Sequence, residues 1–270
     1  MTRIALVVSD VDGTLLTKDK VLTDRARAAV QRLHQAGIAF TITSSRPTIG
    51  MHFLVEPLGI TLPVGPFNGS SIVAPDMKPI EQHLLPASAT RRSLEMLSDF
   101  GVDIWLFTNE QWLTKNPRGE YVPREKLAIR ADPTIVDDFA PFIQSACKVV
   151  GSTSDPGLLI RCEKALQQEL GSQAMAVRSQ TYYLDITPPG HNKGTFVQAI
   201  AARLGVPTDA VATIGDMQND VAMFKASGLS YAMGNASADV KSHARRSTAS
   251  NEEDGFALAM DQILMENAGV

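Results

Sequence analysis

Cysteine is scarce in this chain of 270 residues, which has only Cys147 and Cys162. Two cysteines in so long a chain do not make a disulfide framework, and the two are not spaced as a pair of metal ligands. The sequence therefore predicts two reduced thiols in or near the core, and it excludes the class of small secreted domains that disulfides hold together.

Long hydrophobic runs and a surplus of positive charge are also missing. The apolar run near the N-terminus, Ile4–Val8, is far too short for a signal peptide or a membrane span. The formal net charge of −4 argues against nonspecific binding to nucleic acid, which requires clustered positive charge. These absences predict a cytoplasmic protein that has neither a membrane nor a nucleic acid as its partner.

The residues that are present have the composition of a soluble globular protein. Hydrophobic residues make up 44% and charged residues 20% of the chain, both close to the average for such proteins. The length is sufficient for one large domain or two modest ones, each with a buried core.

The first 70 residues alternate strand and helix patterns. The continuous apolar run Ile4–Val8 is typical of a strand buried on both faces of a parallel sheet. Thr23 is a good N-cap for a helix that ends at Gly37. Ile38–Thr43 predicts a second strand and Leu62–Phe67 a short third one. This alternation favours an α/β fold with a doubly wound, Rossmann-like parallel sheet.

The same alternation returns near the C-terminus, with strands expected at Val211–Ile214 and Leu229–Ala232. The pattern between the two halves is different. Val102–Phe107 and Gln111–Thr114 are separated only by Thr108–Glu110, which is the spacing of a hairpin. We therefore predict an inserted α+β domain at 83–185 and a discontinuous core domain at 1–82 and 186–270.

Two acidic residues, Asp10 and Asp12, directly follow the first predicted strand, and Gly13 provides a turn. Ligands of doubly wound sheets bind beyond the carboxyl ends of the strands. Because burying two carboxylates together is costly, a cation or a shared proton is expected there. The alternative is an ordinary turn with solvated acids.

Further polar groups follow or begin other predicted elements. Ser44, Ser45 and Arg46 follow the second strand, where hydroxyls and backbone N–H groups can hold an anion. Lys193 begins a helix, and Gly215–Asp220 follows the strand at Val211–Ile214. Each feature alone is also typical of a simple helix start. Together they suit a divalent cation and a phosphate, and Mg²⁺ is preferred because the ligands are hard oxygens.

Four motifs in order resemble those of the haloacid dehalogenase (HAD) superfamily. They are Asp10–Leu15, Ser44–Arg46, Lys193–Gly194 and Gly215–Asp220. The insertion after Asn68-Gly69 resembles the C2-type α/β cap of the Cof-type branch, so the resemblance covers nearly the whole chain. The second motif departs from the usual Thr-Gly-Arg, but Ser44 keeps the hydroxyl.

The resemblance implies a role for each motif residue. Asp10 is the expected nucleophile, which would form a phospho-aspartyl intermediate, and Asp12 the expected general acid and base. Mg²⁺ would be bound by the Asp10 carboxylate, the main-chain carbonyl of Asp12 and Asp216, with support from Asp220. Lys193 is also expected to be catalytic. The candidates for binding the transferring phosphoryl group are Ser44, Ser45, Arg46, Asn68, Lys193 and Asn219.

The resemblance implies a phosphatase for small phosphorylated metabolites, such as sugar phosphates. Asp12 favours phosphate chemistry, because a halide leaving group requires no proton. A phosphomutase and a catalytically silent binding protein remain as alternatives, and the oligomeric state is open. Residues of the inserted domain that could contact substrate, each with packing or surface charge as its alternative, are Trp105, Trp112, Arg118, Tyr121, Arg124 and Lys126.

Overall fold

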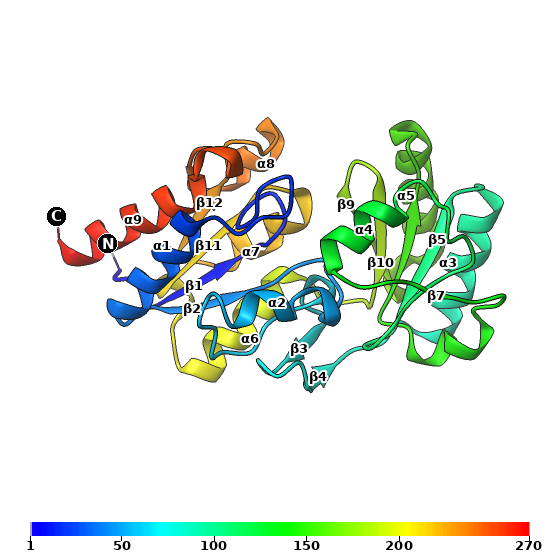
Figure 1. The fold of residues 1–270 in the computed structure, drawn as a ribbon, viewed down its shortest axis with the longest axis horizontal. Helices are drawn as coiled ribbons and strands as arrows, with labels where there is room; N and C mark the ends of the chain where they lie inside the picture. Colours follow the sequence, from blue (N-terminus) through cyan, green and yellow to red (C-terminus); the bar gives the residue numbers. More distant parts are fainter. Residues whose placement is uncertain (1, 270) are drawn as a thin grey trace.

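The computed structural model describes residues 2–269 and contains two separate main sheets. A five-stranded parallel sheet lies toward one end of the elongated molecule, and a six-stranded sheet lies toward the other (Figure 1). The predicted α/β fold with a central parallel sheet is therefore present. No helix within residues 2–269 is both long and apolar enough to cross a membrane.

The parallel sheet has the strand order β13-β12-β11-β1-β2. Its strands are β1 (Leu6–Ser9), β2 (Ala39–Ile42), β11 (Val211–Gly215), β12 (Leu229–Ala232) and β13 (Arg246–Ser247). The helices around it are α1 (Asp24–Gln35), α2 (His52–Val55), α6 (Lys193–Leu204), α7 (Val221–Lys225), α8 (Ala238–His243) and α9 (Gly255–Ala268).

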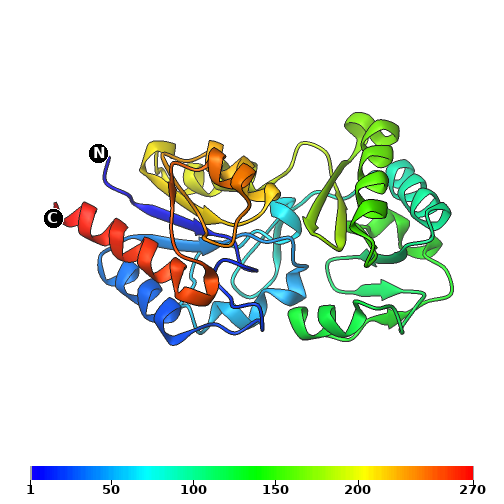
Figure 2. The ribbon, with the colours of Figure 1, turned by 90° about the horizontal axis from the view of Figure 1, so that it is seen from above.

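Both faces of the parallel sheet are buried, as the continuous apolar run in β1 predicts. Val7 packs into the cluster formed with α1 and α9, whereas Leu6 and Val8 pack into the cluster formed with α6 and α7. Figure 2 shows the two helical layers on opposite sides of the sheet. Thr23 caps α1 by accepting a hydrogen bond from the Ala26 N–H, as expected.

The predicted third strand at Leu62–Phe67 is wrong. The segment is extended but makes only isolated bridges, from Gly65 to Thr43 and from Val64 to Val73. Pro63 and Pro66 lie in it and cannot donate to a ladder, which explains why regular pairing fails. A short 3₁₀ turn at Phe67–Gly69 follows, before a small hairpin formed by β3 (Ser71–Val73) and β4 (Pro79–Gln82).

The six-stranded sheet has the order β7-β6-β5-β8-β10-β9. Its strands are β5 (Asp103–Phe107), β6 (Trp112–Thr114), β7 (Thr134–Ile135), β8 (Lys148–Ser152), β9 (Met175–Gln180) and β10 (Tyr183–Thr187). The predicted hairpin is confirmed, because β5 and β6 pair antiparallel. One face packs against α3 (Ala87–Asp99) and α5 (Pro156–Leu170). The other face packs against α4 (Val122–Ile129) and contacts Phe67 from the first part of the chain.

Candidate active site

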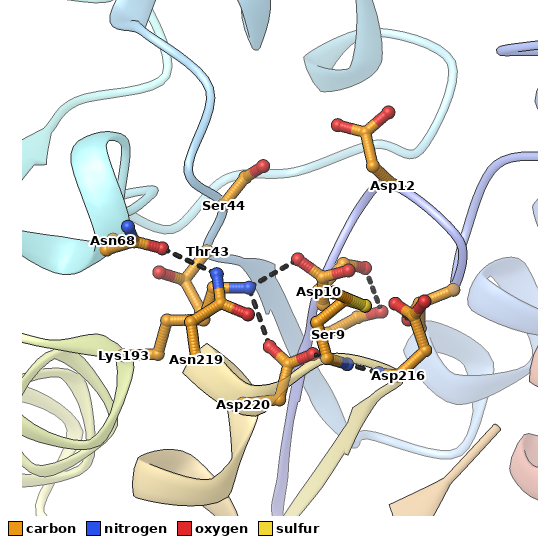
Figure 3. A network of polar contacts seen from close by, with 12 residues as sticks. Ser9, Asp10, Asp12, Thr43, Ser44, Asn68, Lys193, Asp216, Asn219 and Asp220 are labelled. Carbon is orange, nitrogen blue, oxygen red and sulfur yellow. Dashed lines mark hydrogen bonds and ion pairs between the residues drawn. The ribbon is translucent and has the colours of Figure 1, made fainter. Parts of the chain in front are cut away.

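Polar residues from several elements meet at the carboxyl edge of the parallel sheet (Figure 3). Asp10 follows β1, Ser44 follows β2, and Asp216 follows β11, while Lys193 is the first residue of α6. The side chains converge because β1 pairs in parallel with both β2 and β11, so the three strands end together. Residues far apart in the sequence therefore form one site.

Three buried carboxylates form the centre of this site. Asp10, Asp216 and Asp220 each place an oxygen within 4.8 Å of the others. Lys193 is 1% exposed, and its Nζ lies 2.5 Å from Asp10 Oδ1 and 2.6 Å from Asp220 Oδ1. Gly13 allows the close approach of Asp216, since a Cβ at Gly13 would lie 2.4 Å from Asp216 Oδ2. One ammonium group thus faces three acids, which leaves the cluster short of positive charge.

The protonation of the cluster reflects this shortage. Burial raises the pKa of Asp10 to about 7, although Lys193 opposes the rise. The pKa of Asp216 is raised well above its usual value, first by burial and then by repulsion from Asp10 and Asp220. Burial alone would lower the pKa of Lys193, but the two neighbouring carboxylates raise it instead, so Lys193 stays charged. The cluster consequently retains an extra proton near neutral pH, or accepts a cation.

The donor set fits a hard divalent cation. Asp220 Oδ2 accepts hydrogen bonds from the backbone N–H groups of Asp216 and Met217, both at 2.8 Å, while its Oδ1 faces Lys193. Both oxygens of Asp220 are therefore occupied, and this residue orients the loop. Within residues 2–269 the cluster of Asp10, Asp216 and Asp220 contains no His or Cys, and the carboxylate oxygens of Asp10 and Asp216 suit Mg²⁺.

The Asp12 side chain points away from Asp10 (Figure 3). Its Oδ2 lies 2.6 Å from Arg46 Nε, and its Oδ1 lies 2.8 Å from Arg46 Nη2 and 2.5 Å from Lys20 Nζ. Burial alone would raise the pKa of Asp12, but Arg46 and Lys20 hold it well below its usual value. In this arrangement Asp12 is ionised and cannot donate a proton.

Arg46 also connects Asp12 with α4, the helix on one face of the six-stranded sheet. Its Nη1 donates to the carbonyl oxygen of Gly50 at 3.1 Å and to that of Ala128, near the C-terminal end of α4. The side chain is almost completely buried. The structure therefore places Arg46 between the candidate general acid and α4, and its binding to phosphate stays a prediction.

The remaining predicted phosphate ligands divide into two groups. Ser44, Asn68 and Asn219 lie around Lys193 (Figure 3), and Asn219 Nδ2 donates to Asn68 Oδ1 at 2.8 Å. Within residues 2–269 the buried Oδ1 of Asn219 has no hydrogen-bond partner, so it is available to a ligand. Ser45 instead faces the six-stranded sheet, where its carbonyl accepts a hydrogen bond from Lys148 Nζ at 2.8 Å.

Comparison with known proteins identifies the family. The family of haloacid dehalogenase-like hydrolases matches residues 7–260. The chain belongs to this family. The superfamily and the fold class inferred from the motifs are thus confirmed, and the chain is a hydrolase of this type.

The sequences of curated relatives and the folds of solved structures align with most of this chain. A putative phosphatase of Haemophilus influenzae is 26% identical over 261 residues, covering 96% of this chain and 98% of the relative. An HMP-PP phosphatase of Cronobacter sakazakii is 27% identical and covers 84% of this chain and 83% of the relative. A crystal structure of a haloacid dehalogenase-like hydrolase from Bacteroides thetaiotaomicron is 28% identical, with a TM-score of 0.85 and coverage of 97% and 100%.

A narrow cavity of about 30 Å³ lies beside Asp12 in this hydrolase, between the two sheets. The parallel-sheet side contributes Asp12, Lys20, Ser45 and Arg46. The other side contributes Arg124, Glu125, Ala128, Ile129, Lys148, Ser179, Gln180, Tyr182 and Tyr183. Because Asp12 is the candidate acid for the leaving group, this cavity is where the predicted leaving group is expected to lie.

Sequence reasoning missed the buried charges Glu125 and Lys148 of this cavity. Neither belongs to a motif, and an isolated Glu in a short helix or a Lys at the start of a strand is usually solvated. Here Glu125 is only 7% and Lys148 only 4% exposed. Their burial results from the packing of α4 and β8 against the parallel-sheet side, which no local pattern records.

The substrate contacts considered for the inserted segment have mixed outcomes. Trp105 and Trp112 are buried against each other, with ring centroids 5.1 Å apart, which favours the packing alternative. Tyr121 stacks on Tyr182, a residue of the cavity wall. Arg118 is exposed, Lys126 forms an exposed ion pair with Asp132, and Arg124 alone of these three cations lines the cavity.

Proposed function

We propose that this hydrolase is a magnesium-dependent phosphatase that acts on small phosphorylated metabolites, such as sugar phosphates, through a phospho-aspartyl intermediate on Asp10. The observation that carries the proposal is the buried cluster of Asp10, Asp216 and Asp220 around Lys193, with a second acid, Asp12, on the leaving-group side. The curated relatives named as phosphatases support this activity.

In this proposal Asp10, Asp216 and the main-chain carbonyl of Asp12 hold Mg²⁺, and Asp220 orients the loop that carries Asp216. The bound ion supplies positive charge that offsets the repulsion between the nucleophile and the phosphate. Lys193 adds a further positive charge beside Asp10, where its Nζ lies 2.5 Å from Oδ1. The nucleophile is thereby held in one orientation.

Phosphoryl transfer then proceeds in two steps. A carboxylate oxygen of Asp10 forms a bond to phosphorus while the bond to the leaving oxygen breaks. Ser44, Lys193, Asn68 and Asn219 surround the place where the phosphoryl oxygens would lie, and charge complementarity of this kind dominates catalysis of phosphoryl transfer. Water then attacks the phosphorus of phospho-Asp10, which releases phosphate and restores the carboxylate.

Asp12 is the proposed proton donor to the leaving alcohol and then the base that activates water. For the first role its pKa must rise, because Arg46 and Lys20 keep it ionised in this arrangement. The two cations must therefore shift away from Asp12 before the first step. Ser45 and Arg46 are proposed to help bind substrate from the cavity side.

We also propose a division into a core at 1–82 and 186–270 and a cap at 83–185. The strands of the parallel sheet all lie in the proposed core, and β5–β9 all lie in the proposed cap. β10 (Tyr183–Thr187) begins in the cap and ends past residue 185. The cavity beside Asp12 then lies between core and cap.

The roles of the two acids are tested by trapping the intermediate. Asp10→Asn and Asp12→Asn variants are mixed with an aryl phosphate and Mg²⁺, quenched in acid and weighed as intact proteins. The Asp12 variant should slow hydrolysis by about 10²- to 10⁴-fold and accumulate phospho-enzyme, because an aryl leaving group needs little protonation. The Asp10 variant should carry no phosphate.

An Asp19→Asn variant is the matched control, since Asp19 lies in the same loop but is exposed. It should hydrolyse the aryl phosphate like the unmodified protein. Phosphate on the Asp10 variant, or full activity of the Asp12 variant, would contradict the assignment of the two acids.

A further inference from the structure

Glu125 is a buried carboxylate that the proposed mechanism does not use. It lies in the first turn of α4, lines the cavity beside Asp12 and is only 7% exposed. A buried carboxylate is costly unless a cation or hydrogen bonds compensate it. Within residues 2–269, however, no cation lies within the 4.0 Å of an ion pair with Glu125.

The two nearest buried cations are already occupied by other groups. Arg46 donates to both oxygens of Asp12 and to the carbonyls of Gly50 and Ala128. Lys148 donates to the carbonyl of Ser45, and its Nζ lies 3.5 Å from Asp185 Oδ1. The nearby Tyr183 hydroxyl donates to the main-chain carbonyl of Tyr121 at 3.5 Å, and within residues 2–269 no donor makes a hydrogen bond of 3.5 Å or less to the Glu125 carboxylate. Glu125 thus keeps acceptor capacity that faces the cavity.

Burial raises the pKa of Glu125 above its usual value, although Lys148 and Arg46 oppose the rise. The two carboxylates of the cavity, Asp12 and Glu125, are outnumbered by its four cations, which are Lys20, Arg46, Arg124 and Lys148. This excess of positive charge disfavours a cationic leaving group. A neutral hydroxyl can donate to Glu125 without adding charge, and it can accept from Lys148 or Ser179.

We infer that Glu125 is a specificity-determining residue, which accepts a hydrogen bond from a hydroxyl of the leaving group and so selects sugar or polyol monophosphates over phosphates without hydroxyls. This inference rests on the proposed phosphatase activity and names the residue that recognises the leaving group. Asp12 protonates the ester oxygen, while Glu125, on the opposite wall of the cavity, binds a hydroxyl elsewhere on the same group.

The test compares two kinds of substrate in the full-length protein. A panel of sugar and polyol monophosphates provides leaving groups with hydroxyls, and phenyl phosphate provides one without. In Glu125→Leu, which has no acceptor, kcat/KM for the best hydroxylated substrate should fall by about 10- to 100-fold, which corresponds to the loss of one hydrogen bond to a charged group. In Glu125→Gln, whose amide oxygen can still accept, kcat/KM should fall by a smaller factor. For phenyl phosphate, kcat/KM should change less than threefold.

Two control variants separate this role from a structural one. Tyr183→Phe removes the hydroxyl beside Glu125, which donates to the carbonyl of Tyr121, and should leave the substrate preference in place. If it reproduces the Glu125→Gln effect, Glu125 acts only by positioning Tyr183. Glu120→Gln changes an exposed acid near α4 and should alter neither substrate. Thermal unfolding checks that each variant is folded. If Glu125→Leu does not fold, Glu125→Gln alone provides the test.

The outcomes distinguish the inference from the function on which it rests. If the unmodified protein hydrolyses neither class of phosphate with Mg²⁺, the proposed function fails and the inference with it. If it hydrolyses both but prefers phenyl phosphate, or if Glu125→Gln lowers both by the same factor, the phosphatase stands and the role of Glu125 is refuted. A selective loss of hydroxylated substrates supports the inference.

Discussion

Without a bound metal, the folded protein is expected to lose stability as the pH rises from about 5 to 7. Burial raises the pKa of Asp10 from 3.8 to about 7. A carboxyl group with a higher pKa in the folded state binds its proton more tightly there than in the unfolded chain. Its contribution to stability is therefore full below pH 3.8 and is lost as the pH rises toward 7.

The size of the effect follows from the same linkage. Each pH unit between about 5 and 7 costs about 1.4 kcal/mol for one such proton, so Asp10 alone accounts for roughly 3 kcal/mol. Asp216, whose pKa is also raised, acts in the same direction. For a protein of this size, about 3 kcal/mol corresponds to a decrease in Tm of roughly 6–12 °C.

The assay is thermal unfolding in EDTA at pH 5.0 and 7.5, for the unmodified protein and for Asp10→Asn. The Asn variant keeps the shape of Asp10 but has no proton to lose, so its Tm should depend much less on pH and should exceed that of the unmodified protein at pH 7.5. Added Mg²⁺ should stabilise the unmodified protein more at pH 7.5 than at pH 5.0, because it competes with the proton. Equal pH dependence in the two proteins, or equal stabilisation by Mg²⁺ at both pH values, would refute the reasoning.

Three further outcomes follow from the structure. Hydrolysis of phosphate esters should stop in EDTA and return with Mg²⁺ but not with Ca²⁺, which accepts a looser shell of ligands; turnover in metal-free buffer would contradict this. Trp112→Ala should destabilise the fold by about 3–5 kcal/mol and lower activity toward all substrates by a common factor, since Trp112 is buried and does not line the cavity. A changed ranking of the substrates would show that Trp112 contacts the substrate instead. His83 and His191 stack with ring centroids 3.5 Å apart, and the pKa of His191 is lowered by burial and by His83. His83→Gln should therefore raise the pKa of His191 in an NMR titration, and an unchanged pKa would contradict this prediction.

The convergence of Asp10, Lys193 and Asp216 could be predicted from the sequence because it depends only on topology. An apolar run followed by an acid marks the carboxyl end of a buried strand, and parallel strands end at one edge of the sheet. The same reasoning failed at Leu62–Phe67, where apolar content predicted a strand but two prolines removed the necessary donors. In this segment, the missing backbone N–H of each proline has more influence on strand pairing than the apolar side chains do.

The partners of Asp12 could not be predicted in this way. Lys20 lies in a turn and Arg46 in a motif that predicts contact with phosphate, and neither pattern records which carboxylate the cation faces. The burial of Glu125 and Lys148 is even harder to predict from the sequence, since it requires two sheets to come together. Local patterns thus predict the cluster around Asp10, whereas the surroundings of Asp12 depend on tertiary packing.

The packing around Asp12 couples access to the site with the charge of its carboxylate. A cavity of about 30 Å³ has room for only two or three water molecules, so a sugar cannot enter it as it stands. Arg46 lines the cavity and links its two sides, because it donates both to Asp12 and to the carbonyl of Ala128 in α4. Moving Arg46 to admit a leaving group would therefore also remove one of the two cations that keep Asp12 ionised. In the proposed mechanism, the movement that opens the cavity would thus also raise the pKa of Asp12, in the direction that a proton donor requires.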